Sequence, residues 1–236
     1  MEASDSKIGF FGKLPSHGDF VRRALPSALT KPWDDWLQAG LATSRKELGD
    51  AWLDCYLSAP IWRFCLGAGI CGETQWIGAI MPSVDRVGRY FPLTAATAIP
   101  PSQSLFGMAT AANSWLTALE NAMLSALEED RLTADEFGNR LKAIEPLNTS
   151  ASAEGISEDR QLTQEDGCLA LPFADPRRLA DAPGTFADAM ARRSCGGFSL
   201  WWTSGSAHVS PSVRVYTDLP AADTFWALLC RDRPLG

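Results

Sequence analysis

The chain has 236 residues, of which 46% are hydrophobic and 21% are charged, and its formal net charge is -7 at pH 7. This length and apolar content suffice for one domain with a sizeable buried core. General nucleic-acid surfaces and anionic-membrane surfaces need an excess of Lys and Arg on one face, so an acidic chain argues against both partners. We therefore expect one domain over residues 1–236, with no nucleic-acid partner and no membrane insertion.

The first seven residues, MEASDSK, are polar and acidic, which is unlike a secretory signal. No later segment is apolar for long enough to span a bilayer, so we expect a cytoplasmic protein. We also expect residues 1–7 to be flexible. Residues 147–167 contain few large apolar side chains and much Ser, Glu, Asp and Gln, which predicts a mobile surface excursion.

In chain order, short apolar stretches bounded by Gly, Pro or polar residues predict strands at residues 8–11, 62–67, 74–81, 91–99, 197–203 and 212–216. Apolar residues at a spacing of three or four, with capping signals, predict helices at residues 32–48, 51–57, 105–129, 134–144, 185–190 and 221–230. Pro32 suits a first helical turn. Thr133 and Glu136 have the spacing of a capping box.

Strands that alternate with helices early in the chain, followed by a late hairpin, indicate an α/β layered sandwich. We expect a central mixed β-sheet flanked by helices. The last two strands are close enough in sequence to form an antiparallel hairpin.

The six cysteines show no Cys-x-x-Cys spacing, and most have apolar neighbours. We interpret them as buried reduced thiols rather than as metal ligands or disulfides. They are Cys55, Cys65, Cys71, Cys168, Cys195 and Cys230. The sequence indicates no metal and no cofactor.

One group of polar side chains lies between the apolar stretches 76–80 and 91–99: Ser83, Asp85, Arg86 and Arg89. Pro and Gly in the same segment predict a turn at a sheet edge, a position where binding residues tend to lie. The alternative interpretation is structural, with Asp85 pairing with Arg86 or Arg89 and capping the turn.

A second group follows the first predicted strand: Lys13, Ser16, His17 and Asp19. The Gly-x-x-Gly-Lys pattern differs from a phosphate-binding loop, which has four residues between its glycines and Ser or Thr after the Lys. The second group also includes the residue types of a hydrolytic triad. Neighbours in one loop usually point in different directions, which favours a binding or structural role.

The segments GFFGKLPSHGDF (9–20) and MPSVDRVGRYFPLT (81–94) together resemble the TagF family associated with bacterial type VI secretion. APIWRF (59–64) and SLWW (199–202) extend the resemblance over most of the chain. It implies a stand-alone post-translational repressor that binds a forkhead-associated scaffold component within a threonine-phosphorylation pathway.

The leading hypothesis is that both polar groups form one surface that binds this protein partner, with Arg86 and Arg89 holding an acidic or phosphorylated segment. A hydrolase using Ser83 or Ser16 with His17 and Asp85 is an alternative, although the chain lacks a Gly-x-Ser-x-Gly elbow. A pocket for a small effector is a third. The oligomeric state, the partner-facing surface and the signal that relieves repression do not follow from the sequence.

Overall fold

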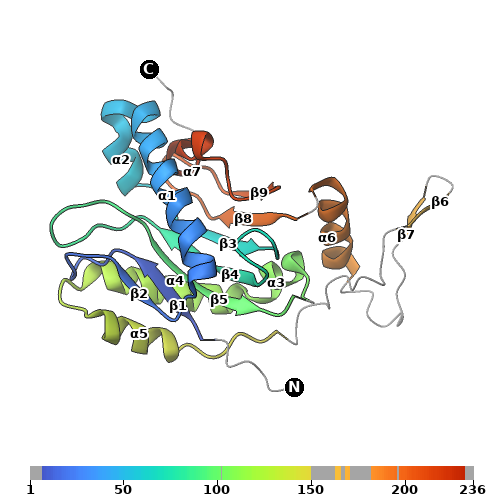
Figure 1. The fold of residues 1–236 in the computed structure, drawn as a ribbon, viewed down its shortest axis with the longest axis horizontal. Coiled ribbons are helices and arrows are strands. Elements are labelled where there is room, and N and C mark those ends of the chain that lie inside the picture. Colours follow the sequence, from blue (N-terminus) through green and yellow to red (C-terminus); the bar gives the residue numbers. More distant parts are fainter. Residues whose placement is uncertain are drawn as a thin grey trace.

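The computed structural model describes residues 7–101, 103–149, 163–165, 168–170, 182–195 and 197–231. Its centre is a seven-stranded sheet in the order β2-β1-β5-β4-β3-β8-β9. Helices lie on both faces of this sheet (Figure 1). The strands are β1 Gly9–Gly12, β2 Val21–Arg23, β3 Trp62–Leu66, β4 Gln75–Met81, β5 Leu93–Ile99, β8 Ser199–Thr203 and β9 Ser212–Tyr216.

The layered α/β architecture is as predicted, and so is the late antiparallel hairpin formed by β8 and β9. The sheet itself differs from the mixed one expected, because each neighbouring pair of its seven strands is antiparallel. Short connections between β1 and β2, β3 and β4, and β4 and β5 explain the difference. A short loop can join only antiparallel neighbours, whereas parallel strands need a long crossover.

One face of the sheet is covered by α1 Ser27–Leu48, α2 Trp52–Leu57 and α7 Trp226–Cys230, and the other by α3 Leu105–Ala111, α4 Asn113–Glu128 and α5 Ala134–Lys142 (Figure 1). Short 3-10 turns precede α2 at Gly49–Ala51 and α7 at Ala222–Thr224. A further helix, α6 Ala182–Cys195, packs against α3. None of the helices within the described ranges is long and apolar enough to cross a membrane.

Two hydrophobic cores lie on opposite faces of the sheet, and the strands contribute alternate residues to them. On β3, Phe64 belongs to the core beneath α1 and α2, whereas its neighbour Cys65 belongs to the core beneath α3 and α4. On β4, Ile80 and Ile77 divide in the same way. Because successive side chains of a strand point to opposite faces, central strands covered on both sides are apolar throughout.

Several predicted helices have different bounds in the structure: the helix predicted at 185–190 is α6 Ala182–Cys195, and the one predicted at 221–230 begins as a 3-10 turn before α7. The first helix begins at Ser27, five residues before the predicted start at Pro32, so the proline lies inside the helix. The earlier turn forms because Leu29 is buried in the core. Tertiary burial there outweighs the local signal of the proline. The long predicted helix divides at Ala112 into α3 and α4. The capping box of Thr133 and Glu136 is confirmed at the start of α5.

Most of residues 1–7 and of the predicted excursion at 147–167 lie outside the described residues. Near the end of the excursion, β6 Thr163–Glu165 pairs with β7 Cys168–Ala170 as a separate two-stranded sheet. The flexibility of both segments and the single-domain organisation therefore stay predictions.

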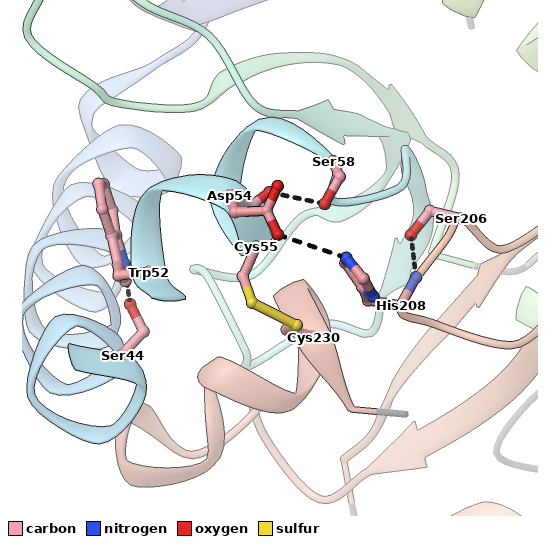
Figure 2. The surroundings of a disulfide bond; sticks show 8 residues. All are labelled: Ser44, Trp52, Asp54, Cys55, Ser58, Ser206, His208 and Cys230. Carbon is pink, nitrogen blue, oxygen red and sulfur yellow. Dashed lines mark hydrogen bonds and ion pairs between the residues drawn. A yellow bond between two sulfur atoms is a disulfide. The ribbon is translucent and has the colours of Figure 1, made fainter. Parts of the chain in front are cut away.

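The cysteine prediction is wrong for one pair, because Cys55 of α2 and Cys230 of α7 form a disulfide (Figure 2). The two residues are 175 positions apart, so local spacing contains no sign of their contact. Cys65 and Cys71 are buried free thiols, as predicted, and burial raises the pKa of the Cys71 thiol to about 12. The side chains of Cys168 and Cys195 lie outside the described part of the chain.

We expect the disulfide to stabilise the packing of α7 on α2. Replacing both cysteines, as Cys55→Ser with Cys230→Ser, lowers the free energy of unfolding by about 2–5 kcal/mol, the usual contribution of a native disulfide. Thermal unfolding with and without a dithiol reductant checks this. The reductant lowers the Tm of the unaltered chain and leaves that of the double variant unchanged; an equal response of both proteins would contradict the prediction.

Candidate partner-binding site

The two polar segments singled out in the sequence meet at one end of the sheet. The first follows β1, and the second is the turn between β4 and β5, the strand that pairs with β1. The Arg86 backbone N–H donates to the His17 carbonyl oxygen at 2.9 Å, and the Arg89 guanidinium donates to the Gly18 carbonyl oxygen. The leading hypothesis required this proximity, and the structure shows it.

Asp85 organises the turn from within. Its Oδ1 atom accepts hydrogen bonds from the backbone N–H groups of Val87 at 3.0 Å and Arg89 at 2.9 Å. Gly88, at a φ of 84°, supplies the left-handed conformation that lets the turn close, and a bridge between Val84 and Tyr90 completes it. The structural interpretation of Asp85 as the cap of its own turn is therefore confirmed.

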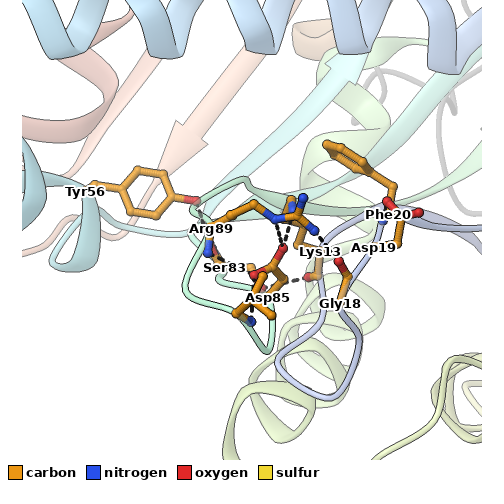
Figure 3. A network of polar contacts seen from close by, with 9 residues as sticks. Lys13, Gly18, Asp19, Phe20, Tyr56, Ser83, Asp85 and Arg89 are labelled. Atoms are coloured by element: carbon orange, nitrogen blue, oxygen red, sulfur yellow. Dashed lines mark hydrogen bonds and ion pairs between the residues drawn. The ribbon is translucent and has the colours of Figure 1, made fainter.

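The same carboxylate ties the turn to the segment after β1. Its Oδ2 atom forms an ion pair with the Lys13 ammonium, and accepts a hydrogen bond from Arg89 Nε at 2.7 Å (Figure 3). The Asp85 side chain is fully buried and that of Lys13 nearly so, whereas the Arg89 side chain is 57% exposed. Burial raises the pKa of the Asp85 carboxyl, but the hydrogen bonds from Lys13, Arg89 and Val87 outweigh it and hold the pKa well below its usual range.

Ser83 is also a structural member of the site. Its hydroxyl donates to the Lys13 carbonyl oxygen at 2.7 Å. Its backbone carbonyl accepts a hydrogen bond from the Tyr56 hydroxyl at 2.9 Å, and its N–H donates to that hydroxyl at 3.1 Å. The buried Tyr56 of α2 thus fixes the base of the turn, and nothing in the local sequence indicated this role.

Ser16, His17 and Asp19 contribute less to the contact between the segments than their sequence positions suggested. The Ser16 hydroxyl donates to the Leu132 carbonyl oxygen and lies 2.8 Å from His17 Nδ1. Asp19 is exposed and accepts a hydrogen bond from the N–H of Phe20 at 2.8 Å. Among the described residues, the hydrogen bond that joins His17 to the turn is the one its backbone carbonyl accepts from Arg86.

The exposed part of the site includes two apolar residues that the sequence reasoning missed, Phe20 and Val87. Phe20 is 45% exposed and Val87 is 65% exposed. Each adjoins a predicted polar residue, so an apolar side chain inside a polar loop is the sequence signal that could have identified them. The exposed cations beside them are Arg86 and Arg89.

The arrangement does not match that of a hydrolytic triad. A Ser16 hydroxyl that donates to the Leu132 carbonyl directs its proton away from His17, so Nδ1 is the donor of their contact. Ser83 is buried and donates to a carbonyl. Among the described residues, no carboxylate hydrogen-bonds the His17 ring, and Asp85 is engaged by Lys13 and Arg89. Ser16, Ser83 and Asp85 therefore do not stand in the roles of nucleophile and acid.

The cavity that adjoins the turn is too small for an organic effector. Tyr56, Pro82 and Pro92 line it together with side chains of the aromatic core, and its volume is about 30 Å³. That is room for about one water molecule. Within the described ranges, no cluster of three or more His, Cys, Asp or Glu side chains has the geometry to hold a metal ion.

Comparison with known proteins places both segments within one family. The family model of the TagF N-terminal domain, described as type VI secretion system-associated, matches residues 9–144. Among solved structures, the chain is similar to the crystal structure of PA0076 from Pseudomonas aeruginosa PAO1, with 33% sequence identity and a TM-score of 0.77. That similarity covers 97% of this chain and 96% of PA0076. A search of curated proteins found no match.

The buried ion pair predicts a strong effect of Asp85→Asn on stability. This change leaves the Lys13 ammonium buried without its counter-charge, so we expect the free energy of unfolding to fall by about 3–5 kcal/mol. Arg86→Ala is the matched control, because its side chain is exposed, and it changes the same quantity by less than about 0.5 kcal/mol. Denaturant unfolding of both variants measures the difference; similar values would contradict the structural role of Asp85.

The lowered pKa of Asp85 predicts how this stabilisation depends on pH. The unfolded chain protonates Asp85 near pH 3.9, roughly the ordinary value, whereas the folded chain does so at lower pH. The contribution of ionised Asp85 to the free energy of unfolding is therefore fully present above about pH 4, and it is lost as the pH falls through the pKa of Asp85 in the folded chain. Unfolding measured between pH 6 and pH 3 shows a shrinking difference between the unaltered chain and Asp85→Asn. A difference that stays constant below pH 4 would refute this assignment.

Proposed function

Because the chain belongs to the TagF family of type VI secretion system-associated proteins, we propose that it is a non-enzymatic negative regulator of type VI secretion. In this proposal it acts after translation by binding the forkhead-associated scaffold component of the secretion apparatus. The predicted surface of Lys13, Ser16, His17, Asp19, Ser83, Asp85, Arg86 and Arg89 contains the contact.

The buried ion pair of Lys13 and Asp85 is the observation that supports a binding role. It joins two chain segments into one rigid unit, and it leaves Arg86 and Arg89 on the outside. A binding surface gains affinity when its contact groups are held in place before the partner arrives. The polar groups that would be needed for catalysis are instead engaged with one another or with the backbone.

This division changes the roles of the predicted residues. Lys13, Ser83 and Asp85 are buried, so in the proposal they hold the surface together and do not touch the partner. Arg86, Arg89 and Asp19 are exposed and are available for contact. Ser16 and His17 are half-buried, and in the proposal they support the loop that follows β1.

We expect the purified chain to bind the purified forkhead-associated component of the same bacterium, and its overproduction to reduce the amount of type VI effector released into the medium. Arg86→Glu reverses one exposed charge of the surface and weakens both effects without unfolding the chain. Lys142→Glu, an exposed charge reversal on α5, is the control and leaves both unchanged. Calorimetric titration and quantitative blotting measure the two effects. No binding by the unaltered chain would refute the proposed partner.

A further inference from the structure

We infer that the partner segment recognised at this site is acidic, is not phosphorylated and carries one apolar side chain. The inference rests on the proposed function and names the chemistry of its partner. The contact residues are Phe20, Arg86, Val87 and Arg89, which we call the Phe20–Val87 surface. Only the two arginines belong to the surface predicted from the sequence.

The apolar half of this surface is held in place although it faces solvent. The ring of Phe20 packs edge-to-face on Phe91 at 4.8 Å between centroids, and stacks on Phe11 at 5.9 Å. The Lys13 ammonium lies 4.8 Å from the centroid of the same ring. Phe20 nevertheless stays 45% exposed. A fixed, exposed aromatic ring next to arginines is typical of the centres of protein interfaces.

Val87 is a second exposed apolar side chain, at the tip of the other segment. Its backbone N–H is bound by the Asp85 carboxylate, which fixes the tip of the turn, while its side chain is 65% exposed. Apolar surface of the partner that packs on Phe20 and Val87 would remove these side chains from water. The removal of apolar surface from water favours binding.

The charge of the surface has the opposite sign to that of the whole chain. The formal net charge of the protein is -7, yet the two segments bring together the cations Lys13, Arg86 and Arg89. Their carboxylates are Asp85, which the Lys13 and Arg89 side chains already bind, and Asp19. The Arg86 guanidinium makes no hydrogen bond or ion pair with a described residue. The partner that complements this local field carries carboxylates.

The hydrogen bonds that Arg89 already makes within the chain favour a carboxylate over a phosphate group as the ligand of this surface. Its Nε and one terminal nitrogen are already bound by Asp85 and by the Gly18 carbonyl oxygen. Arg86 is therefore the one guanidinium of the surface with its full donor set free. A single planar guanidinium matches a single carboxylate, whereas recognition of a dianionic phosphate typically uses a cluster of free arginines. Affinity must then come from the carboxylate and the apolar contact together.

A selection of random ten-residue peptides against the folded chain tests this without reference to the scaffold protein. We expect the selected peptides to contain Asp or Glu on both sides of one Phe, Trp or Leu. Phe20→Ala, Arg86→Glu and Val87→Ser each weaken the binding of these peptides about tenfold or more. Val213→Ser is the matched control, because Val213 is 67% exposed on β9, and it leaves the affinity unchanged.

Three results would overturn the inference: selected peptides without acidic residues, selected peptides that bind the three variants as tightly as the unaltered chain, or threonine-containing peptides that bind only after phosphorylation. Because Phe20→Ala also removes core contacts, the folding of each variant is checked by its Tm. Val87→Ser and Arg86→Glu, whose side chains face solvent, carry the test if Phe20→Ala unfolds.

Titration of the same variants with the forkhead-associated component separates this inference from the proposed function. Binding by the unaltered chain and by Val213→Ser, with about tenfold weaker binding by Arg86→Glu and Val87→Ser, supports both. Equal binding by all of these proteins overturns the surface and leaves the partner in place. If the scaffold does not bind while acidic peptides do, the proposed partner is wrong and the chemistry of the surface stands.

Discussion

The buried ion pair between Lys13 and Asp85 is the interaction on which the site depends. The two residues are 72 positions apart, and neither charge is stable away from water without the other. Their attraction therefore fixes the segment after β1 against the turn between β4 and β5. Since Asp85 also binds the backbone of its own turn, one carboxylate determines both the shape of the turn and its position.

The sheet topology makes this pair possible. β1 enters the sheet beside β5, so the end of β1 lies against the start of β5, directly after the turn. Gly12 allows a close approach there, because a Cβ atom at this position would lie 2.1 Å from the Pro92 carbonyl oxygen. The Gly-Lys sequence that superficially resembles a phosphate loop is thus explained by backbone packing, with the lysine directed to Asp85. Tyr56, from the helical layer, fixes the other side of the turn.

Features with a local cause were predictable from the sequence, and features with a distant cause were not. The capping box of α5 and the β8–β9 hairpin depend on neighbouring residues, and both are present. The disulfide, the burial of Lys13 and the early start of α1 depend on contacts between residues that are far apart in the chain. Motif resemblance singled out two segments that the structure brings together. It did not distinguish the residues that hold the site from those that face outward.

That distinction decides what the polar motif residues do. A side chain that is buried and bound on several sides, as Asp85 is, contributes by holding its neighbours in place. The exposed residues beside it are the ones that the proposed partner would contact. The low pKa of Asp85 follows from the same bonds, and it keeps the carboxylate ionised throughout the neutral range. Changes of pH near 7 therefore do not change the charge of Asp85 or the contacts that it makes. Under the proposed function, a pH signal near neutrality therefore acts through groups other than Asp85.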